Sequence, residues 1–341
     1  MERNHFDYNK YEETSVGEGI TKDQENLYSN SGRTTTIEEP RLTEGTNQFI
    51  YAGQVEGKAK KTLIQYDYVF GKFLNYLGED PPLTEVSSFV IRGFLKELRD
   101  DNNISKATVA IHYRVLNALF NFLVAEDLLD KSPTTNINEP KTPKIYPKTL
   151  TEEEVQKMLK VVKENGQKWT GCRNYTIVLC FVELGLRLSE LINAELDDLK
   201  LYQNSLHVTG KGSKERIVSY GPTLSKQLRK WLRRRDTLEA IYDDTIFLSK
   251  TGEKLKRRNV QHTITRIQRW AGLEDKKVSP HVLRHTSATL AAKNGMNTFQ
   301  LQRFFGWENL KTALKYIHLS GRDLHEAMLE ASPIENMQNK V

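Results

Sequence analysis

The sequence predicts a mainly α-helical protein of two domains with one small β-hairpin. Apolar residues recur at three- and four-residue spacing over long stretches, which is typical of amphipathic helices. The exception is 204–221, "NSLHVTGKGSKERIVSYG", where two β-branched runs flank a glycine-containing turn. A length of 341 residues favours two domains over one.

Residues 1–45 are predicted to form a disordered polar tail, because they are rich in Glu, Thr, Asn, Ser and Gly and lack an apolar period. The alternative for this segment is a short helix that forms on binding a partner. This tail has ten acidic and five basic residues, so the rest of the chain carries a net charge of +11. Basic clusters at 58–61, 229–235 and 254–258 favour a polyanionic partner such as nucleic acid, although such runs also occur on solvated helix faces.

The segment 46–131 is predicted to be a small helical bundle. Apolar spacing marks helices over 60–77, over a stretch ending near Asp100, and over a third stretch that begins with Ser105 as its N-cap. The third helix is expected to bury five apolar side chains, those of Val109, Leu116, Leu119, Phe120 and Leu123.

A proline-rich polar segment, 132–148, follows the bundle. Its four prolines cannot continue a helix, so we expect an extended linker between domains. The second domain, 149–332, opens with Thr151 before acidic residues, a pattern typical of a capping box. It is predicted to be mostly helical, and 333–341 form a short C-terminal tail.

The cysteine count and the absence of long apolar runs predict a cytoplasmic protein. Two cysteines, Cys172 and Cys180, in a chain of this length indicate a reducing compartment without a disulfide framework. No apolar run approaches the roughly 20 residues that span a bilayer. The polar N-terminus also lacks the apolar stretch of a secretory signal.

Two short stretches carry candidate cationic groups. In 183–191, Glu190 follows Arg187 by three residues, close enough on a helix to orient the guanidinium or simply to form a surface ion pair. Lys211 lies at the hairpin tip between glycines that allow close approach of the backbone. The segment fails as a nucleotide phosphate loop, because Ser205 and Gly212 stand where that loop needs Gly and Ser or Thr.

A third stretch, "SPHVLRHTSATL" at 279–290, favours a phosphate site. Ser279 and Pro280 suit the start of a helix, whose free N–H groups attract an anion beside His281 and Arg284. A zinc site at His281 and His285 lacks the intervening glutamate and any nearby cysteine, so we expect no metal. His285 is instead expected to be a buried, hydrogen-bonded histidine behind the site.

The fourth stretch, 301–320, holds two aromatic candidates. Gly306 can end one helix and Asn309 can cap the next, which places Trp307 in a turn and Tyr316 two turns into the second helix. Taken alone, Tyr316 is an ordinary core aromatic.

Together, the four stretches resemble the tyrosine recombinase (phage integrase) family over about residues 50–330. The family's words "GLRLSEL", "GKGSKER" and "LRHTSAT" carry the resemblance, with the catalytic set in order: Arg187, Lys211, His281, Arg284, Trp307 and Tyr316. The resemblance implies a two-domain tyrosine recombinase with a helical core-binding (SAM-like) domain and a mixed, mostly helical catalytic domain. DNA would be clamped between the two domains. Tryptophan replaces the histidine of many bacterial members at 307, and an indole can donate but cannot shuttle a proton.

The resemblance implies that DNA is cut by Tyr316 through a 3′-phosphotyrosyl intermediate and rejoined by way of a Holliday junction. Arg187 and Arg284 would grip the phosphate oxygens, and Lys211 would protonate the departing 5′ oxygen. His281 would add a hydrogen bond or help to handle the tyrosine proton, and Trp307 would donate one more hydrogen bond, with Glu190 and His285 supporting. The surrounding cations are expected to ease formation of the phenolate, and no cofactor or metal is required.

The implied partner is double-stranded DNA carrying a specific recombination site, bound by a homotetramer spanning two such sites, with accessory proteins left open. The C-terminal helix, with Leu324, Met328 and Leu329 on one stripe, would dock on a neighbouring protomer or pack in cis. Candidate DNA contacts are Lys60, Lys61, Lys106, Arg257 and Arg258.

The acidic tail favours a mobile-element or phage integrase, acting on the nucleoid in the cytoplasm, over a housekeeping resolvase. The alternatives are a type IB topoisomerase that relaxes supercoils and a DNA-binding regulator without catalysis.

Overall fold

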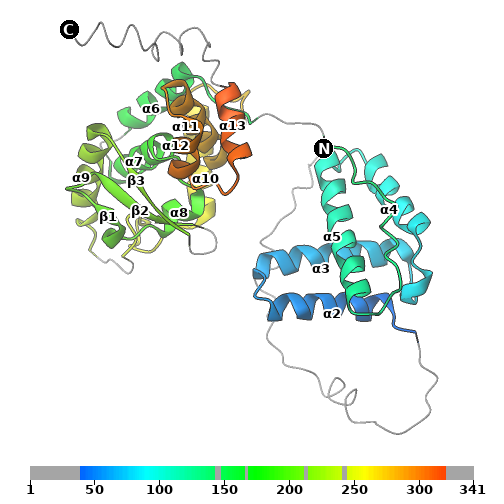
Figure 1. The fold of residues 1–341 in the computed structure, drawn as a ribbon. Coiled ribbons are helices and arrows are strands. Elements are labelled where there is room, and N and C mark those ends of the chain that lie inside the picture. Colours follow the sequence, from blue (N-terminus) through cyan, green and yellow to red (C-terminus); the bar gives the residue numbers. More distant parts are fainter. Residues whose placement is uncertain (1–38, 143–146, 166–167, 211–213, 240–243, 320–341) are drawn as a thin grey trace, which may run out of the picture. The chain divides into compact units, whose positions relative to one another are not determined.

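The computed structural model describes residues 39–142, 147–165, 168–210, 214–239 and 244–319 (Figure 1). The chain divides into two compact units, Met1–Lys144 and Ile145–Val341, and each has its own hydrophobic core. The described residues are mostly helical with one three-stranded sheet, so the predicted fold class is confirmed.

Four α-helices make up the described part of the first unit: α2 (Leu42–Val55), α3 (Lys60–Leu77), α4 (Ser88–Asp100) and α5 (Lys106–Ala125). The range of α3 is the one that its apolar spacing predicts. The prediction of disorder is wrong for 42–45, because α2 begins at Leu42, whose side chain is fully buried. Gly45 allows this helix to lie against α5, since a Cβ built on it would be 3.0 Å from Leu123 Cδ2.

Helix α5 lies at the centre of this unit and contacts α2, α3 and α4. The predicted N-cap is confirmed, because Ser105 Oγ accepts a hydrogen bond from the Thr108 N–H at 3.1 Å. The five apolar side chains predicted to be buried in this helix all lie in the core. Within the described residues α5 alone is long and apolar enough to cross a membrane, but half of that stretch is buried in the unit, as suits a core helix.

Residues 132–139 lie in the first unit, so the predicted linker 132–148 begins too early. The Tyr113 hydroxyl donates to the Ile137 carbonyl at 2.6 Å, and Thr134 Oγ1 donates to Asn117 Oδ1 at 2.8 Å. These contacts hold the segment to α5 although its polar, proline-containing sequence predicts none.

The described part of the second unit contains the sheet and the remaining helices: α6 (Glu152–Glu164), α7 (Trp169–Glu183), α8 (Leu188–Asn193), β1 (Leu199–Lys200), β2 (Ser205–Thr209), β3 (Glu215–Ser219), α9 (Pro222–Arg235), α10 (Arg257–Trp270), α11 (Pro280–Lys293), α12 (Thr298–Phe305) and α13 (Leu310–Leu319). Strands β2 and β3 form the predicted hairpin, with Leu206 opposite Val218, and β1 pairs with β2 in the same antiparallel sheet. Helix α7 is the core helix, packed against α6, α9 and α11. The predicted capping box at Thr151 is confirmed.

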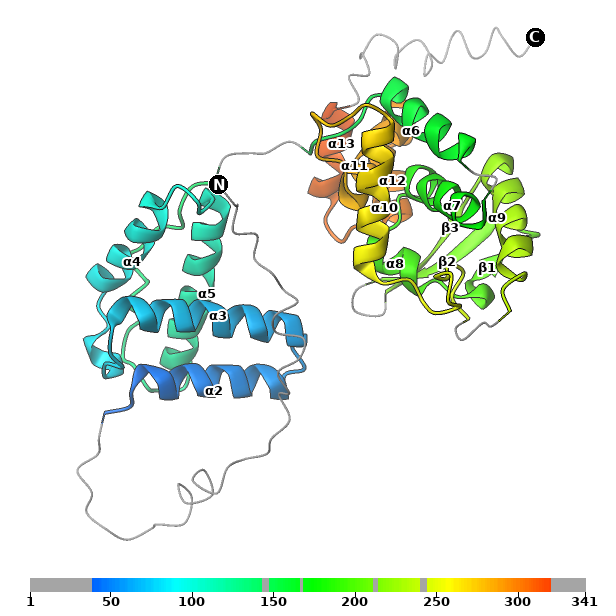
Figure 2. The same cartoon turned by 180° about the vertical axis from the view of Figure 1, so that it is seen from behind.

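Helices α11, α12 and α13 lie side by side in both views of the unit (Figures 1 and 2). They enclose a small apolar cluster, separate from the main core, that includes Leu301, Phe305 and Tyr316. The candidate tyrosine is therefore held by packing between three short helices.

Replacing Phe120 of α5 by alanine tests the central place of this helix. Phe120 is fully buried, so Phe120→Ala is expected to lower the unfolding free energy of the first unit by about 3–5 kcal/mol. The matched control is Phe89→Ala on α4, where the ring is 82% exposed. Urea titration followed by hydrogen exchange of α5 amides measures both, and equal losses from the two variants would contradict this packing.

Candidate active site

Five of the six predicted catalytic residues line one cavity of about 600 Å³. They come from the start of α8, the first turns of α11, the α12–α13 turn and α13: Arg187, His281, Arg284, Trp307 and Tyr316. His285 and Arg257 line the same cavity. The sixth residue, Lys211, lies outside the described residues, as does the predicted C-terminal helix.

A tight turn before α8 brings Arg187 and Arg284 together. Gly185 has a φ of +55°, and a Cβ at this position would lie 2.2 Å from Phe305 Cε1, so only glycine fits. The Gly185 carbonyl accepts a hydrogen bond from Arg284 Nη1. Arg187, two residues after Gly185, is the N-cap of α8. The turn therefore places Arg187 beside Arg284.

The Glu190 carboxylate lies at the centre of this cluster of positive charge, and its side chain is 1% exposed. It accepts from the Arg187 N–H and from Arg187 Nη1, both at 2.7 Å, and from Arg216 Nη1 and Nη2 at 2.8 and 2.9 Å. Arg284 Nη1 is 3.8 Å away. Burial alone would raise the pKa of Glu190, but the hydrogen bonds and charge of Arg216 and Arg187 outweigh it and lower the pKa to about 2.

The C-terminal end of α12 binds the same three arginines. Its last carbonyls accept in turn: Phe304 from Arg216 Nε at 2.9 Å, Phe305 from Arg284 Nη2, and Gly306 from Arg187 Nη2 at 3.1 Å. Guanidinium groups suit this end, because the helix dipole is negative there. Arg187 and Arg284 each use two of their five N–H groups in these contacts with the α12 end and with Gly185 or Glu190, so donors remain for an oxyanion.

Arg216 is a site residue that the sequence analysis missed. It lies on β3, its side chain is 9% exposed, and it joins the hairpin both to Glu190 and to the end of α12. Strand periodicity offers a signal, since Arg216 shares the inward face of β3 with the buried Val218. An arginine on the inward face of a strand needs a buried acidic partner, and Glu190 is that partner.

An aromatic stack holds Tyr316. The Trp307 ring lies parallel to it at 4.8 Å and parallel to Phe305 on its other side at 4.9 Å. The Arg284 guanidinium lies 5.4 Å from the Phe305 ring centroid, within cation–π distance. The structure therefore gives Trp307 a packing role, and its predicted hydrogen bond to a ligand stays a prediction.

Tyr316 differs from expectation in its acidity. The side chain is 2% exposed, and burial raises the pKa of the phenol to about 12, although Arg284 acts in the opposite direction. The Arg284 charge does lower the cost of the phenolate, as expected, but desolvation outweighs it, so the net shift of the pKa is upward.

His285 also differs from expectation. It is half-buried and faces the cavity instead of lying behind it, and its Nδ1 hydrogen-bonds the Tyr316 hydroxyl. Burial, and then the charges of His281, Arg284 and Lys315, lower the pKa of His285 to about 4. The pKa of His281 is also lowered, by burial and then by Arg284 and Arg187.

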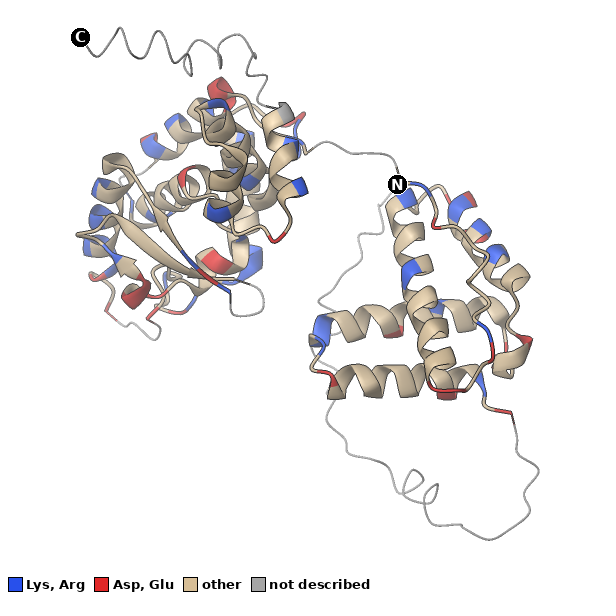
Figure 3. Ribbon diagram, viewed as in Figure 1, with Lys and Arg blue, Asp and Glu red and all other residues tan. Residues whose placement is uncertain are grey.

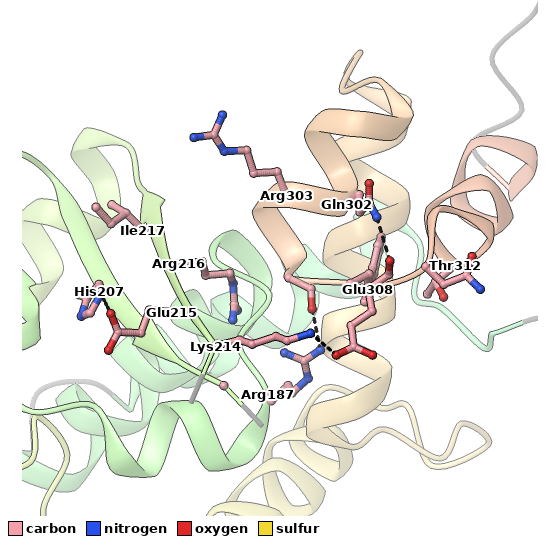
Figure 4. Close-up of a pocket in the computed structure, with 14 residues that line it drawn as sticks. Arg187, His207, Lys214, Glu215, Arg216, Ile217, Gln302, Arg303, Glu308 and Thr312 are labelled. Carbon is pink, nitrogen blue, oxygen red and sulfur yellow. Dashed lines mark hydrogen bonds and ion pairs between the residues drawn. The ribbon is translucent and has the colours of Figure 1, made fainter. Parts of the chain in front are cut away.

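The turn end of the hairpin borders the arginine cluster (Figure 4). A Cβ built on Gly210 would lie 3.8 Å from Arg187 Nη1, and the Gly210 N–H bonds the Lys214 carbonyl at 2.7 Å. Gly210, Lys214 and Arg187 line a second cavity of about 1100 Å³, where Lys214 pairs with Glu308. The flanks of Lys211 are thus anchored at the site.

The five predicted DNA contacts are exposed cations at the starts of helices: Lys60, Lys61, Lys106, Arg257 and Arg258. Figure 3 marks the lysines and arginines along the ribbon of each unit. Arg257 borders the cavity of Tyr316, whereas Arg258 borders a separate cavity with Arg173 and Arg266. Their contacts with DNA stay predictions. Among the described residues no group of three or more His, Cys, Asp or Glu side chains is placed to hold a metal.

The fold and the cavity define a class of protein: a mostly helical protein in which a buried tyrosine lies beside paired arginines, groups that suit the binding of a phosphate. Comparison with known proteins gives the family. The model of the phage integrase family matches residues 148–322. The chain belongs to this family and is a tyrosine-type site-specific recombinase.

Relatives match along most of the chain. Tyrosine recombinase XerA of Pyrococcus furiosus is 32% identical over 86% of this chain and 96% of its own length. Tyrosine recombinase XerC of Thermodesulfovibrio yellowstonii is 29% identical over 82% of this chain and 92% of its own. The fold is similar to that of XerH bound to a palindromic difH substrate, with a TM-score of 0.68, 22% identity and coverage of 86% and 85%. The fold is also similar to that of the Tn1549 transposon integrase, with a TM-score of 0.69 and 17% identity. That match covers 87% of this chain and 100% of the integrase chain.

Glu190→Gln tests the electrostatic centre of the site. At pH 7 the variant is expected to lose about 3 kcal/mol of unfolding free energy, because the buried arginines lose their counter-charge. The folded pKa of about 2 lies below the ordinary 4.5, so the unfolded chain binds the proton first as the pH falls. The contribution of Glu190 is therefore complete above pH 4.5 and declines toward pH 2.

Urea unfolding at a series of pH values measures this effect. The gap between the unaltered protein and Glu190→Gln should narrow from pH 5 to pH 3. Glu164→Gln, at the exposed end of α6, is the matched control and should leave stability unchanged. A gap that stays constant over this range would contradict the assigned ionisation.

Proposed function

We propose that this recombinase cuts and exchanges DNA strands between two copies of a specific site, with Tyr316 as its nucleophile. The observation that supports the proposal is the convergence of Arg187, Arg284 and Tyr316 on one cavity. A phosphodiester in that cavity would lie beside two guanidinium groups and a phenol hydroxyl, which is the set that nucleophilic cleavage of a phosphodiester requires.

The cleavage step follows from these groups. Tyr316 Oη forms a bond to phosphorus while the bond from phosphorus to the 5′ oxygen breaks, which leaves a 3′-phosphotyrosyl ester and a 5′ hydroxyl. Arg187 and Arg284 bind the non-bridging oxygens in charge-assisted pairs that strengthen as charge builds up. His281 and Trp307 border the same oxygens, and Lys211 donates the proton to the departing 5′ oxygen.

The ester conserves the energy of the broken bond, so a 5′ hydroxyl from a second duplex can reverse the attack. Two such rounds, through a Holliday junction, exchange both strands and require four protomers on two sites. A lambda integrase tetramer bound to a Holliday junction has the same fold, with a TM-score of 0.67 at 20% identity. Segment 322–332 would dock between protomers, and accessory proteins would assist.

The acidic N-terminal segment favours a mobile-element or phage integrase acting on nucleoid DNA in the cytoplasm. Its sequence is the basis of this choice, since ten of its 45 residues are acidic.

A nicked suicide substrate tests the nucleophile. Loss of the nicked end traps the covalent ester, so the unaltered protein should form a protein–DNA adduct without added metal. Tyr316→Phe should form none, whereas Tyr202→Phe, at a tyrosine that is 96% exposed, should react normally. Denaturing gel electrophoresis measures the adduct, and an adduct that persists in Tyr316→Phe would place the nucleophile elsewhere.

The same assay separates the alternative functions. Failure of the unaltered protein to form an adduct on its cognate site supports a DNA-binding regulator. An adduct accompanied by supercoil relaxation, without strand exchange between two cognate sites, supports a type IB topoisomerase.

A sulfur leaving group tests Lys211. Lys211→Ala should slow cleavage by on the order of 10²-fold, because the 5′ oxygen loses its proton donor. A 5′-bridging phosphorothioate should restore the rate, since a thiolate departs without a proton. Lys214→Ala is the matched control and should change oxygen and sulfur substrates equally; failure of sulfur to rescue Lys211→Ala would refute the role.

A further inference from the structure

We infer that His285, and not His281, is the catalytic base that receives the proton of Tyr316. The inference rests on the proposed function, because it assigns a role to the residue that touches the proposed nucleophile. It deepens that function by dividing the two histidines of the site between two tasks.

The position of His285 carries the inference. Its Nδ1 hydrogen-bonds the Tyr316 hydroxyl, and the two rings stack at 5.8 Å with 27° between their planes. Helices α11 and α13, which carry these residues, pack against each other, so backbone packing fixes the pair. Because Tyr316 is 2% exposed, its proton needs an acceptor inside the protein, and His285 provides one.

His281 has a different place. Its side chain is exposed, it lines the cavity, and it meets the His285 ring edge to face at 4.1 Å. The charges of Arg284 and Arg187 both act on it. His281 therefore faces the space in which the arginines would bind a phosphate, which suits a donor to a phosphate oxygen.

The ionisation of His285 and Tyr316 agrees with the assignment of His285 as the base. At neutral pH His285 is uncharged. In the tautomer with its ring proton on Nε2, which the inference requires, the lone pair on Nδ1 accepts the hydrogen bond of the Tyr316 hydroxyl. The charged and titratable groups that face it are His281 and Arg284 on its own helix and Lys315 and Tyr316 on α13. The charges of Arg284 and Lys315 disfavour a histidinium in the free protein. A bound phosphodiester brings negative charge and offsets them, so proton transfer accompanies attack on the substrate.

The Oη–H bond of Tyr316 breaks and the proton passes to His285 Nδ1 while the Oη–P bond forms. The bond from phosphorus to the 5′ oxygen breaks, and that oxygen takes its proton from Lys211. On rejoining, the neutral Lys211 amine takes the proton of the attacking 5′ hydroxyl, and the His285 imidazolium returns its proton to the departing tyrosyl oxygen.

Three variants separate proton transfer from positioning. His285→Asn keeps an acceptor oxygen near the place of Nδ1 but removes the base, His285→Ala removes both, and His281→Asn is the matched control on the same helix. The measurement is the single-turnover rate of adduct formation on the suicide substrate at several pH values, with DNA affinity measured in parallel to verify folding.

We expect His285→Asn to bind DNA normally and to cleave on the order of 10²-fold more slowly. Without the base, its rate should rise by about tenfold per pH unit as hydroxide replaces the histidine. Added imidazole should accelerate His285→Ala, because the vacated space opens onto the cavity. His281→Asn should show neither the steep pH dependence nor the rescue.

Cleavage by His285→Asn within threefold of the unaltered rate would overturn the inference, because a hydrogen bond alone would then suffice. A slow His285→Asn with an unchanged pH profile, and no rescue of His285→Ala, would also overturn it in favour of positioning. Either result leaves the proposed function intact if Tyr316-dependent adducts form. If the unaltered protein forms none, both fail.

Discussion

The buried carboxylate of Glu190 is the interaction on which the catalytic unit depends. Three guanidinium groups lie around it, and without a counter-charge their mutual repulsion in a desolvated site would open the cluster. The C-terminal carbonyls of α12 complete the arrangement, since each of the last three binds a different arginine. One acidic side chain and one helix end thus hold the strand β3 and the starts of α8 and α11 together.

This arrangement determines how the remaining groups are placed. The turn that follows α12 positions Trp307, whose ring supports Tyr316, so the geometry of the nucleophile follows from the anchoring of the arginines. In the free protein, burial opposes ionisation of the phenol, and His285 stays neutral. Because the cavity is cationic and its nucleophile is not ionised, entry of an anionic phosphate stabilises the site electrostatically. The chemistry is thereby coupled to binding of the substrate.

Much of the fold and of the site follows from local sequence patterns, and the exceptions have physical causes. Apolar periodicity and capping residues such as Ser105 predict helices because these signals act within one element. The first turn of α2 is missing from the prediction because Gly45 and its polar neighbours weaken the apolar period there, although Leu42 is fully buried in the core. The packing of residues 132–139 against the first unit was not predicted, because it depends on tertiary hydrogen bonds such as that from the Tyr113 hydroxyl to the Ile137 carbonyl.

The candidate site shows the same division. The motif order identifies the residues at 187, 281, 284, 307 and 316, which the structure brings to one cavity. The motifs could not predict that Arg216 pairs with Glu190 or that His285 bonds Tyr316. The first pair is 26 residues apart in the sequence and the second is 31 residues apart, so only the tertiary fold brings them together.

The most direct test of the account is a crystal structure of the protein with its nicked recombination site and orthovanadate, which mimics the pentavalent phosphorus of the transition state. Vanadium is expected in the cavity that Arg187, Arg284 and Tyr316 line, with Tyr316 Oη at one apex and donors from Arg187 and Arg284 on the equatorial oxygens. Vanadate that contacts neither the Arg187 nor the Arg284 guanidinium would contradict the proposed active site. So would vanadate with no Tyr316 hydroxyl, from any subunit, within bonding distance.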